Sequence, residues 1–298
     1  MSEAQAVVCE GLEYTFGGGR RGRGRGTRAV DGIDLTVRTG EVFGLLGPNG
    51  AGKTTTIRAI TTLLPVGVGM VRVFGNDAAR RPMQVRRLLG YVPQQLSADS
   101  GLTGRENVAL FARVFDVPRA ERAERVAQAL AAVDLTDAAD RMAATYSGGM
   151  VRRLELAQAL VSAPRLLVMD EPTIGLDPIA RTGVWERVDA VRRATGMTVL
   201  VTTHYMDEAD RHCDRIALMD RGRIRALGTP AELKDRIRGA DPHRDDPHHG
   251  DPTHDGSSHD DPTLDDVFRH YAGRDLADAT EGDFGDVRRT RRTAGRVG

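Results

Sequence analysis

One segment has the composition and spacing of a phosphate-binding loop. Gly47, Pro48, Asn49, Gly50, Ala51, Gly52, Lys53 and Thr54 fit the pattern G-x-x-x-x-G-K-[ST]. The segment follows an apolar run of strand length and opens a predicted helix. Its glycines let backbone N–H groups turn toward phosphate oxygens, and the helix start adds partial positive charge. We expect this loop, with Thr55, to hold ATP: Lys53 contacts the β- and γ-phosphates, and Thr54 coordinates Mg²⁺.

Two carboxylates end a second apolar run. Residues 166–169 have the composition of a buried strand, and Asp170 and Glu171 follow directly. Asp170 is placed to hold Mg²⁺ through water, whereas Glu171 projects differently and can orient or deprotonate an attacking water. The alternative, two acids that only cap a strand, is less favoured because the phosphate loop is also present.

A second anion site is expected where Tyr146-Ser147-Gly148-Gly149-Met150 opens a helix over 150–161. A serine hydroxyl, two exposed backbone N–H groups and a helix dipole can together bind an anion. A chain with one phosphate loop has no need of this second site unless it serves a different nucleotide.

These motifs resemble the nucleotide-binding subunits of ABC transporters over roughly residues 6–238. Residues 146–150 are similar to the family signature Leu-Ser-Gly-Gly-Gln, with Tyr for Leu and Met for Gln. The resemblance implies two copies that sandwich two ATP molecules, each between one chain's phosphate loop and the other's Ser147. It also implies roles for Gln94 at the metal site and membrane partner, for Asp177 in the D-loop, and for His204 at the γ-phosphate.

The family also stacks an aromatic side chain on the adenine ring. Phe16 is our choice, and Tyr14 is the alternative. A basic glycine-rich segment, 17–26, follows. We interpret it as an inserted surface turn in preference to a nucleic-acid site, because it is short and has no interleaved aromatics. Met150, where the family has Gln, is expected to weaken nucleotide coupling.

The elements that must position these residues can be read from periodicity. Strands are predicted at 6–9, 33–37, 42–46, 166–169, 199–201 and 216–219, and a helical region at 103–163. Helices between the later strands indicate parallel βαβ units. With the resemblance, this predicts an α/β fold: a P-loop NTPase core of ABC type, a mostly helical signature subdomain at about 96–164, and an antiparallel β portion near the N-terminus.

The sequence changes character after the expected ATPase domain, 1–238. Residues 239–262 repeat Asp-Pro and contain His243, His248, His249, His254 and His259. We expect a disordered linker, because so polar a segment cannot bury enough apolar surface to fold. Transition-metal binding by the histidines is the less favoured alternative. Residues 263–298 form a short C-terminal segment with a basic tail. Within the ABC family, residues 29–33 and 264–268 look like the daunorubicin-resistance group of drug-export ATPases.

Composition narrows the functional classes. Hydrophobic residues make up 40% of the chain, the formal net charge is zero, and only two cysteines occur. No long apolar stretch predicts membrane insertion, and no global field attracts nucleic acid. The resemblance to ABC transporter subunits implies an ATP hydrolase of the translocase class on the cytoplasmic side of the membrane. It would drive export of a drug-like or lipid-like molecule through a separate permease. A soluble ABC ATPase acting on DNA or ribosomes, or an importer ATPase, is the alternative.

Overall fold

The computed structural model describes residues 4–17, 26–238 and 261–272. Most of the basic glycine-rich segment (18–25), nearly all of the Asp-Pro-His segment (239–260) and the basic tail (273–298) lie outside the described residues. The expectations of a surface turn, a disordered linker and a metal site fall on these parts of the chain.

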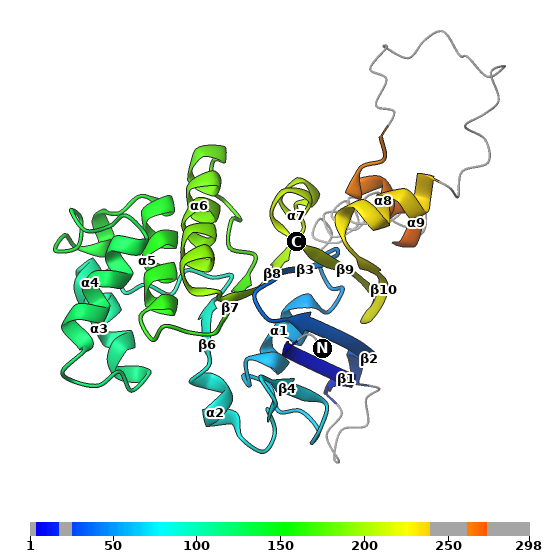
Figure 1. Ribbon diagram of the computed structural model, residues 1–298, viewed down its shortest axis with the longest axis horizontal. Helices are drawn as coiled ribbons and strands as arrows, with labels where there is room; N and C mark the ends of the chain where they lie inside the picture. Colours follow the sequence, from blue (N-terminus) through cyan, green and yellow to red (C-terminus); the bar gives the residue numbers. More distant parts are fainter. Residues whose placement is uncertain (1–3, 18–25, 239–260, 273–298) are drawn as a thin grey trace, which may run out of the picture.

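A six-stranded sheet with the order β10-β9-β3-β8-β7-β6 forms the centre of the molecule (Figure 1). Its strands are β3 (Val42–Leu46), β6 (Leu89–Val92), β7 (Leu166–Asp170), β8 (Thr198–Thr203), β9 (Arg215–Asp220) and β10 (Arg223–Gly228). Five strands are parallel, and β10 pairs antiparallel to β9. In β3, Val42 and Leu46 join one hydrophobic cluster, while Phe43 and Leu45 join the other. Both faces of the sheet are therefore buried, which explains the continuous apolar runs in the sequence.

A smaller antiparallel sheet covers one face of the large sheet. It has the order β2-β1-β4-β5 and contains β1 (Gln5–Phe16), β2 (Thr27–Arg38), β4 (Val71–Val73) and β5 (Asn76–Asp77). Its apolar residues share one cluster with helix α1 (Lys53–Ile60) and with one face of the large sheet. The predicted antiparallel portion is confirmed, and its first two strands extend well beyond the predicted ranges.

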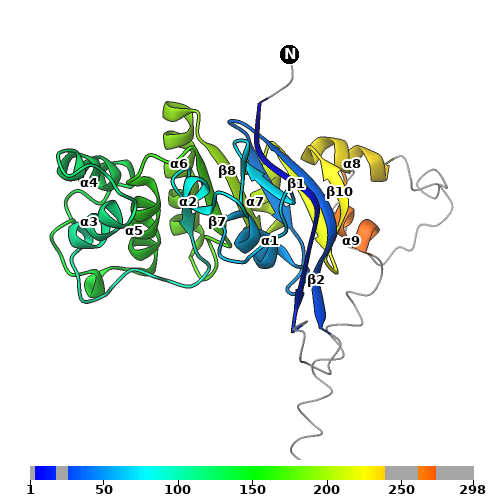
Figure 2. The same cartoon turned by 90° about the horizontal axis from the view of Figure 1, so that it is seen from below.

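Helices fill the chain between β6 and β7. They are α3 (Gly104–Val114), α4 (Arg122–Ala132), the 3₁₀ turn η1 (Ala143–Thr145) and α5 (Gly148–Leu160), and they gather on the side away from α8 and α9 (Figures 1 and 2). Thr103 and Glu106 form the predicted capping box at the start of α3. Helix α5 begins two residues before the predicted position, because Ser147 Oγ accepts from Met150 N at 3.3 Å and caps it.

The remaining helices border the large sheet. They are α2 (Pro82–Arg86), α6 (Pro178–Thr195), α7 (Met206–His212), α8 (Pro230–Arg238) and α9 (Leu264–Ala272). Leu264, Val267 and Phe268 of α9 are buried in the main core. Within the described residues, no helix combines the length and hydrophobicity that crossing a membrane requires.

Candidate functional site

Four strand ends define the candidate site. β3, β8, β7 and β6 are neighbours that run in the same direction, so their carboxyl ends meet at one edge. The phosphate loop follows β3, and Gln94, Glu171 and His204 follow β6, β7 and β8. Open α/β sheets bind ligands at this edge.

A cavity of 370 Å³ lies at this edge. Its lining contains most of the predicted phosphate loop, the predicted residues Gln94 and Glu171, and Ala29 of β2. The loop residues in the lining are Pro48, Asn49, Gly50, Gly52, Lys53, Thr54 and Thr55. Gly47 and Ala51, the two loop residues outside this lining, are buried behind it. The structure thus brings the phosphate loop, Gln94 and Glu171 together.

Two of the loop glycines are required by close backbone contacts. A Cβ on Gly47 would lie 2.1 Å from the Met219 carbonyl oxygen, and one on Gly52 would lie 2.4 Å from the Ala29 carbonyl oxygen. Gly52, with φ of 106°, is also the N-cap of α1 in a left-handed conformation that disfavours other residues. Larger residues at these positions would displace the loop from β9 and β2.

Lys53 lies in the floor of the cavity with only 4% of its surface exposed. Its Nζ donates to Gly47 O at 2.6 Å and to Pro48 O at 3.2 Å, and it lies 3.2 Å from Glu171 Oε1. These contacts compensate the buried charge and fix the ammonium inside the loop. A phosphate bound by the loop would meet this charge directly.

Asp170 is held by two hydroxyl groups. Its Oδ1 accepts from Thr202 Oγ1 at 2.7 Å and from Thr54 Oγ1 at 3.3 Å. Burial raises the pKa of Asp170, and these two hydrogen bonds act in the opposite direction. Because a hydroxyl and a carboxylate are oxygen ligands that Mg²⁺ prefers, the pair Thr54 and Asp170 fits a magnesium site.

The Glu171 side chain points in a different direction from that of Asp170, because the backbone turns sharply at Glu171. Its φ of 50° is left-handed, and Thr202 O and Oγ1 hold its N–H at 3.1 and 3.0 Å. Its Oε1 contacts Lys53, while its Oε2 accepts from Gln94 Nε2 at 3.1 Å and lies 3.6 Å from His204 Nδ1. The Glu171 carboxylate therefore contacts one residue of the phosphate loop and one residue after each of β6 and β8.

Comparison with known proteins shows the family to which the chain belongs. The family model for ABC transporters matches residues 30–174. The chain is 45% identical over 237 residues to daunorubicin resistance ATP-binding protein DrrA2 of Streptomyces coeruleorubidus, over 80% of this chain and 71% of that protein. The chain belongs to the ABC transporter family, among its ATP-binding proteins. The predicted family, fold and ATPase class are confirmed.

Two further relatives extend this comparison. The chain is 51% identical over 212 residues to daunorubicin/doxorubicin resistance ATP-binding protein DrrA of Streptomyces peucetius, and this match covers 71% of the chain but 64% of that relative. It is 45% identical to Nod factor export ATP-binding protein I of Cupriavidus metallidurans, over 71% of the chain and 70% of that protein. The resemblance to the daunorubicin-resistance group is thus confirmed.

Solved structures agree on the fold. An ATP-binding subunit of an ABC transporter superposes with a TM-score of 0.70 at 25% identity, covering 90% of this chain and all of that one. A dimeric ATP-binding cassette in a post-hydrolysis state, bound to ADP and Pi, gives a TM-score of 0.66 at 25% identity, covering 75% and 98%.

The predicted signature residues lie apart from this cavity. Ser147 and Gly148 are exposed at the start of α5, and neither is among the described residues that line the cavity. Gly149 packs against α6, since a Cβ there would lie 3.0 Å from Ala180 Cβ. Asp177, the predicted D-loop residue, caps α6 by accepting from Ala180 N at 2.9 Å. Signature and D-loop therefore form a second cluster on the same chain.

The candidate adenine aromatics also lie outside the cavity lining. Phe16 ends β1 with 43% of its surface exposed, and its ring packs edge-to-face on Tyr14 at 4.9 Å. Neither ring is among the described residues of the lining, to which β2 contributes Ala29. The choice between Phe16 and Tyr14 stays a prediction.

Sequence reasoning did not single out Thr202. This residue bonds both Asp170 and the Glu171 backbone, and it is fully buried. The signal was available in the polar pair Thr202-Thr203 that ends the apolar strand ahead of His204, since buried hydroxyl groups require partners.

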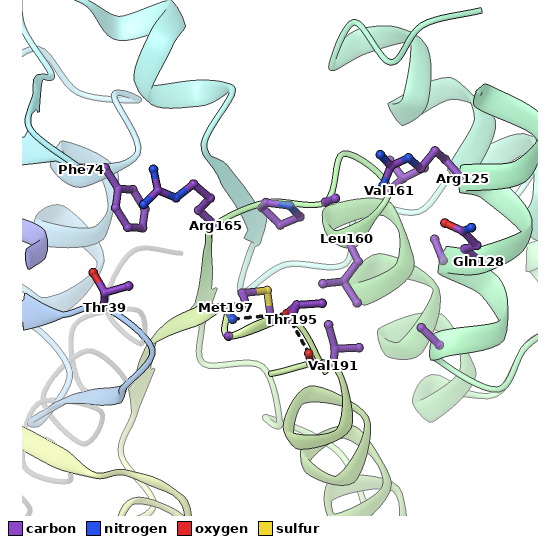
Figure 3. A pocket seen from close by; sticks show the side chains of 15 residues that line it. Thr39, Phe74, Arg125, Gln128, Leu160, Val161, Arg165, Val191, Thr195 and Met197 are labelled. Carbon is purple, nitrogen blue, oxygen red and sulfur yellow. Dashed lines mark hydrogen bonds between the residues drawn. The ribbon is translucent and has the colours of Figure 1, made fainter. Parts of the chain in front are cut away.

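A larger cavity of 480 Å³ lies at the opposite edge of the sheet (Figure 3). Arg165 and Met197 in its lining come directly before β7 and β8, whereas Glu171 and His204 follow these strands. Arg165 lies over the Phe74 ring at 3.9 Å, and the remaining walls are largely apolar. This cavity is therefore separate from the phosphate loop.

Proposed function

We propose that the chain is the energy-coupling subunit of an exporter for a drug-like or lipid-like molecule. The observation that carries the proposal is Glu171, whose carboxylate contacts Lys53, Gln94 and His204 beside the Thr54–Asp170 pair. This arrangement can bind the phosphates of ATP and act on a water molecule. The names of the related resistance and export proteins support export as the purpose of hydrolysis.

The chain's own residues divide the chemistry among them. The loop from Gly47 to Thr55 holds the phosphates through the backbone N–H groups that it offers, and Lys53 neutralises charge on the β- and γ-phosphates. Thr54, Asp170 and Gln94 would hold Mg²⁺, which supplies further charge neutralisation. Glu171 accepts a proton from the attacking water or orients it, and His204 contacts the γ-phosphate.

The second nucleotide contact comes from another copy of the chain. Ser147 and Gly148 are exposed at the N-terminus of α5 and Gly149 follows them, so that a hydroxyl, N–H groups and the helix dipole can meet a γ-phosphate there. Asp177 lies beside them at the start of α6. Two copies would thus enclose two ATP molecules, each between one phosphate loop and the partner's Ser147.

A separate permease would receive the force of hydrolysis near Gln94. Large apolar side chains are exposed on the Gln94 loop and on α3: Leu96 at 59%, Leu110 at 45% and Val114 at 66%. Exposed apolar residues beside a catalytic loop suit a protein contact. The chain would then sit on the cytoplasmic face of the membrane through this partner.

Transport by the chain with its permease tests the proposal. The tagged chain is purified with its membrane partner, reconstituted into vesicles with the ATP site outside, and supplied with ATP and an amphipathic drug. We expect ATP-dependent drug uptake that Lys53→Ala abolishes. ATP hydrolysis without any membrane partner or uptake would instead favour a soluble ABC ATPase.

A further inference from the structure

Helix α5 buries a row of polar side chains. Arg152, Glu155 and Gln158 are spaced three residues apart, so they lie along one face of the helix, and each is at most 3% exposed. Apolar residues of similar volume in place of a buried ion pair are often as stable or more stable. Stability alone therefore does not explain this pair, and its partners indicate what it does.

Arg152 holds the backbone of the Gln94 loop. Its Nη1 donates to Pro93 O at 2.7 Å and its Nη2 donates to Gln94 O at 3.1 Å. Nη1 also donates to Glu155 Oε2 at 2.9 Å. A planar guanidinium can reach two successive carbonyls and a carboxylate at fixed angles, which sets the direction of the Gln94 backbone.

Glu155 holds the same loop three residues later. Its Oε1 accepts from both the backbone N–H and the side-chain Oγ of Ser97, the latter at 3.2 Å. Residues 93–99 have no regular secondary structure, and most of them are exposed. The buried ion pair therefore fixes the position of a loop that has no regular secondary structure of its own.

Gln158 completes the attachment through Asn107 of α3. Gln158 Nε2 donates to Asn107 Oδ1 at 3.1 Å. Asn107 in turn accepts from Asp99 N and donates to Asp99 O, both at 2.9 Å. The far end of the loop is thus tied to the same helix face.

The two ends of this assembly serve different nucleotides. Ser147 caps α5 five residues before Arg152, while the Gln94 side chain reaches Glu171 in the chain's own site. We propose that Arg152 and Glu155 are positioning residues that fix the Gln94 loop to the signature helix, so that Gln94 and Ser147 move as one unit. The proposal rests on the two-copy ATP sandwich of the proposed function. In this proposal, the Arg152–Glu155 ion pair couples the chain's own ATP site to the ATP that Ser147 contacts in the other copy.

A double replacement tests this coupling. Arg152→Met with Glu155→Leu keeps the helix core filled and leaves no unpaired charge, but it releases the loop. We expect unchanged melting temperature and unchanged affinity for a fluorescent ATP analogue. ATPase kcat should fall about 10²-fold, because a displacement of about 1 Å near the reacting atoms can cost that much.

The matched control is Arg153→Met. Arg153 is the next residue of the same helix, but its guanidinium bonds the Val133 and Asp134 carbonyls, away from the Gln94 loop. This variant should keep the wild-type kcat. A double variant with wild-type kcat, or one whose kcat falls in step with melting temperature and ATP affinity, would overturn the proposal.

Arg152→Lys covers the case in which the double variant fails to fold. Lysine keeps the buried charge but has no planar fork to bridge both carbonyls. We expect lower kcat at unchanged KM, and wild-type kcat would overturn the proposal. Wild-type protein without any ATPase activity would instead refute the proposed function, which keeps the two failures distinct.

Discussion

Replacing Thr202 should most directly test how Asp170, the carboxylate that we propose binds Mg²⁺, is held. In the wild type its hydroxyl donates to Asp170 Oδ1 at 2.7 Å, inside a fully buried environment. Thr202→Val keeps the shape of the side chain and removes this donor. The Glu171 N–H loses its contact with Thr202 Oγ1 but retains its hydrogen bond to Thr202 O at 3.1 Å, so the change acts mainly on Asp170.

The expected size of the effect on Mg²⁺ binding follows from the charge on the acceptor, the Asp170 carboxylate. Hydrogen bonds to charged groups contribute about 1.5–3 kcal/mol, which is roughly 10- to 150-fold in an equilibrium constant. Burial already raises the pKa of Asp170, and losing the Thr202 hydroxyl raises it further. A proton then competes better with Mg²⁺. The loss of Mg²⁺ affinity in Thr202→Val should be largest at low pH and should shrink as the pH rises above the pKa of the Asp170 carboxyl.

The assay is ATPase activity as a function of Mg²⁺ concentration and pH. We expect the half-saturating Mg²⁺ concentration to rise by about one to two orders of magnitude. We also expect the acid limb of the pH profile to shift to higher pH. Thr198→Val is the control: Thr198 is buried on the same strand, where its Oγ1 accepts from Gly40 N at 2.9 Å. If both variants show the same Mg²⁺ and pH dependence, the reasoning is wrong.

Three further changes test the loop and the fold. Lys53→Ala should abolish ATP hydrolysis, because it removes the ammonium from the loop, while the protein still folds; undiminished turnover would contradict its role. Gly52→Ala should lose affinity for a fluorescent ATP analogue, since its Cβ would lie 2.4 Å from Ala29 O, and normal affinity would show that the loop tolerates the displacement. Gly183→Ala should stabilise α6 by roughly 0.5–1 kcal/mol, because no atom lies within 4 Å of the new Cβ and Gly weakens helix interiors; a lowered melting temperature would refute this.

The parts of the fold that follow local rules could be predicted from sequence. The apolar runs of β3 and β7 were recognisable because strands buried on both faces carry few polar residues. Strand β10 was not predicted, because it lies at the sheet edge, where its sequence Arg-Ile-Arg-Ala-Leu-Gly is partly exposed. An edge strand takes its structure from its neighbour more than from its own pattern.

The candidate site likewise has parts that could be predicted from the sequence and parts that could not. The phosphate loop and the carboxylate pair were predictable because their chemistry depends on adjacent residues. The contact between Thr202 and Asp170 depends on the parallel register of β7 and β8, which pairs these two residues. The Arg152–Glu155 pair shows helical spacing in the sequence, but its target, the Gln94 loop, is set by tertiary structure alone.

Glu171→Gln tests most directly whether Glu171 acts on the attacking water while two copies of the chain enclose ATP. Glutamine keeps the shape but removes the charge, so ATP–Mg²⁺ should bind while hydrolysis falls by about 10²–10⁴-fold. Light scattering after size-exclusion chromatography, alone and with the membrane partner, should then show an ATP-dependent dimer that Ser147→Arg disperses. Near-normal hydrolysis by Glu171→Gln in both settings, or a dimer that is indifferent to Ser147→Arg, would contradict the account.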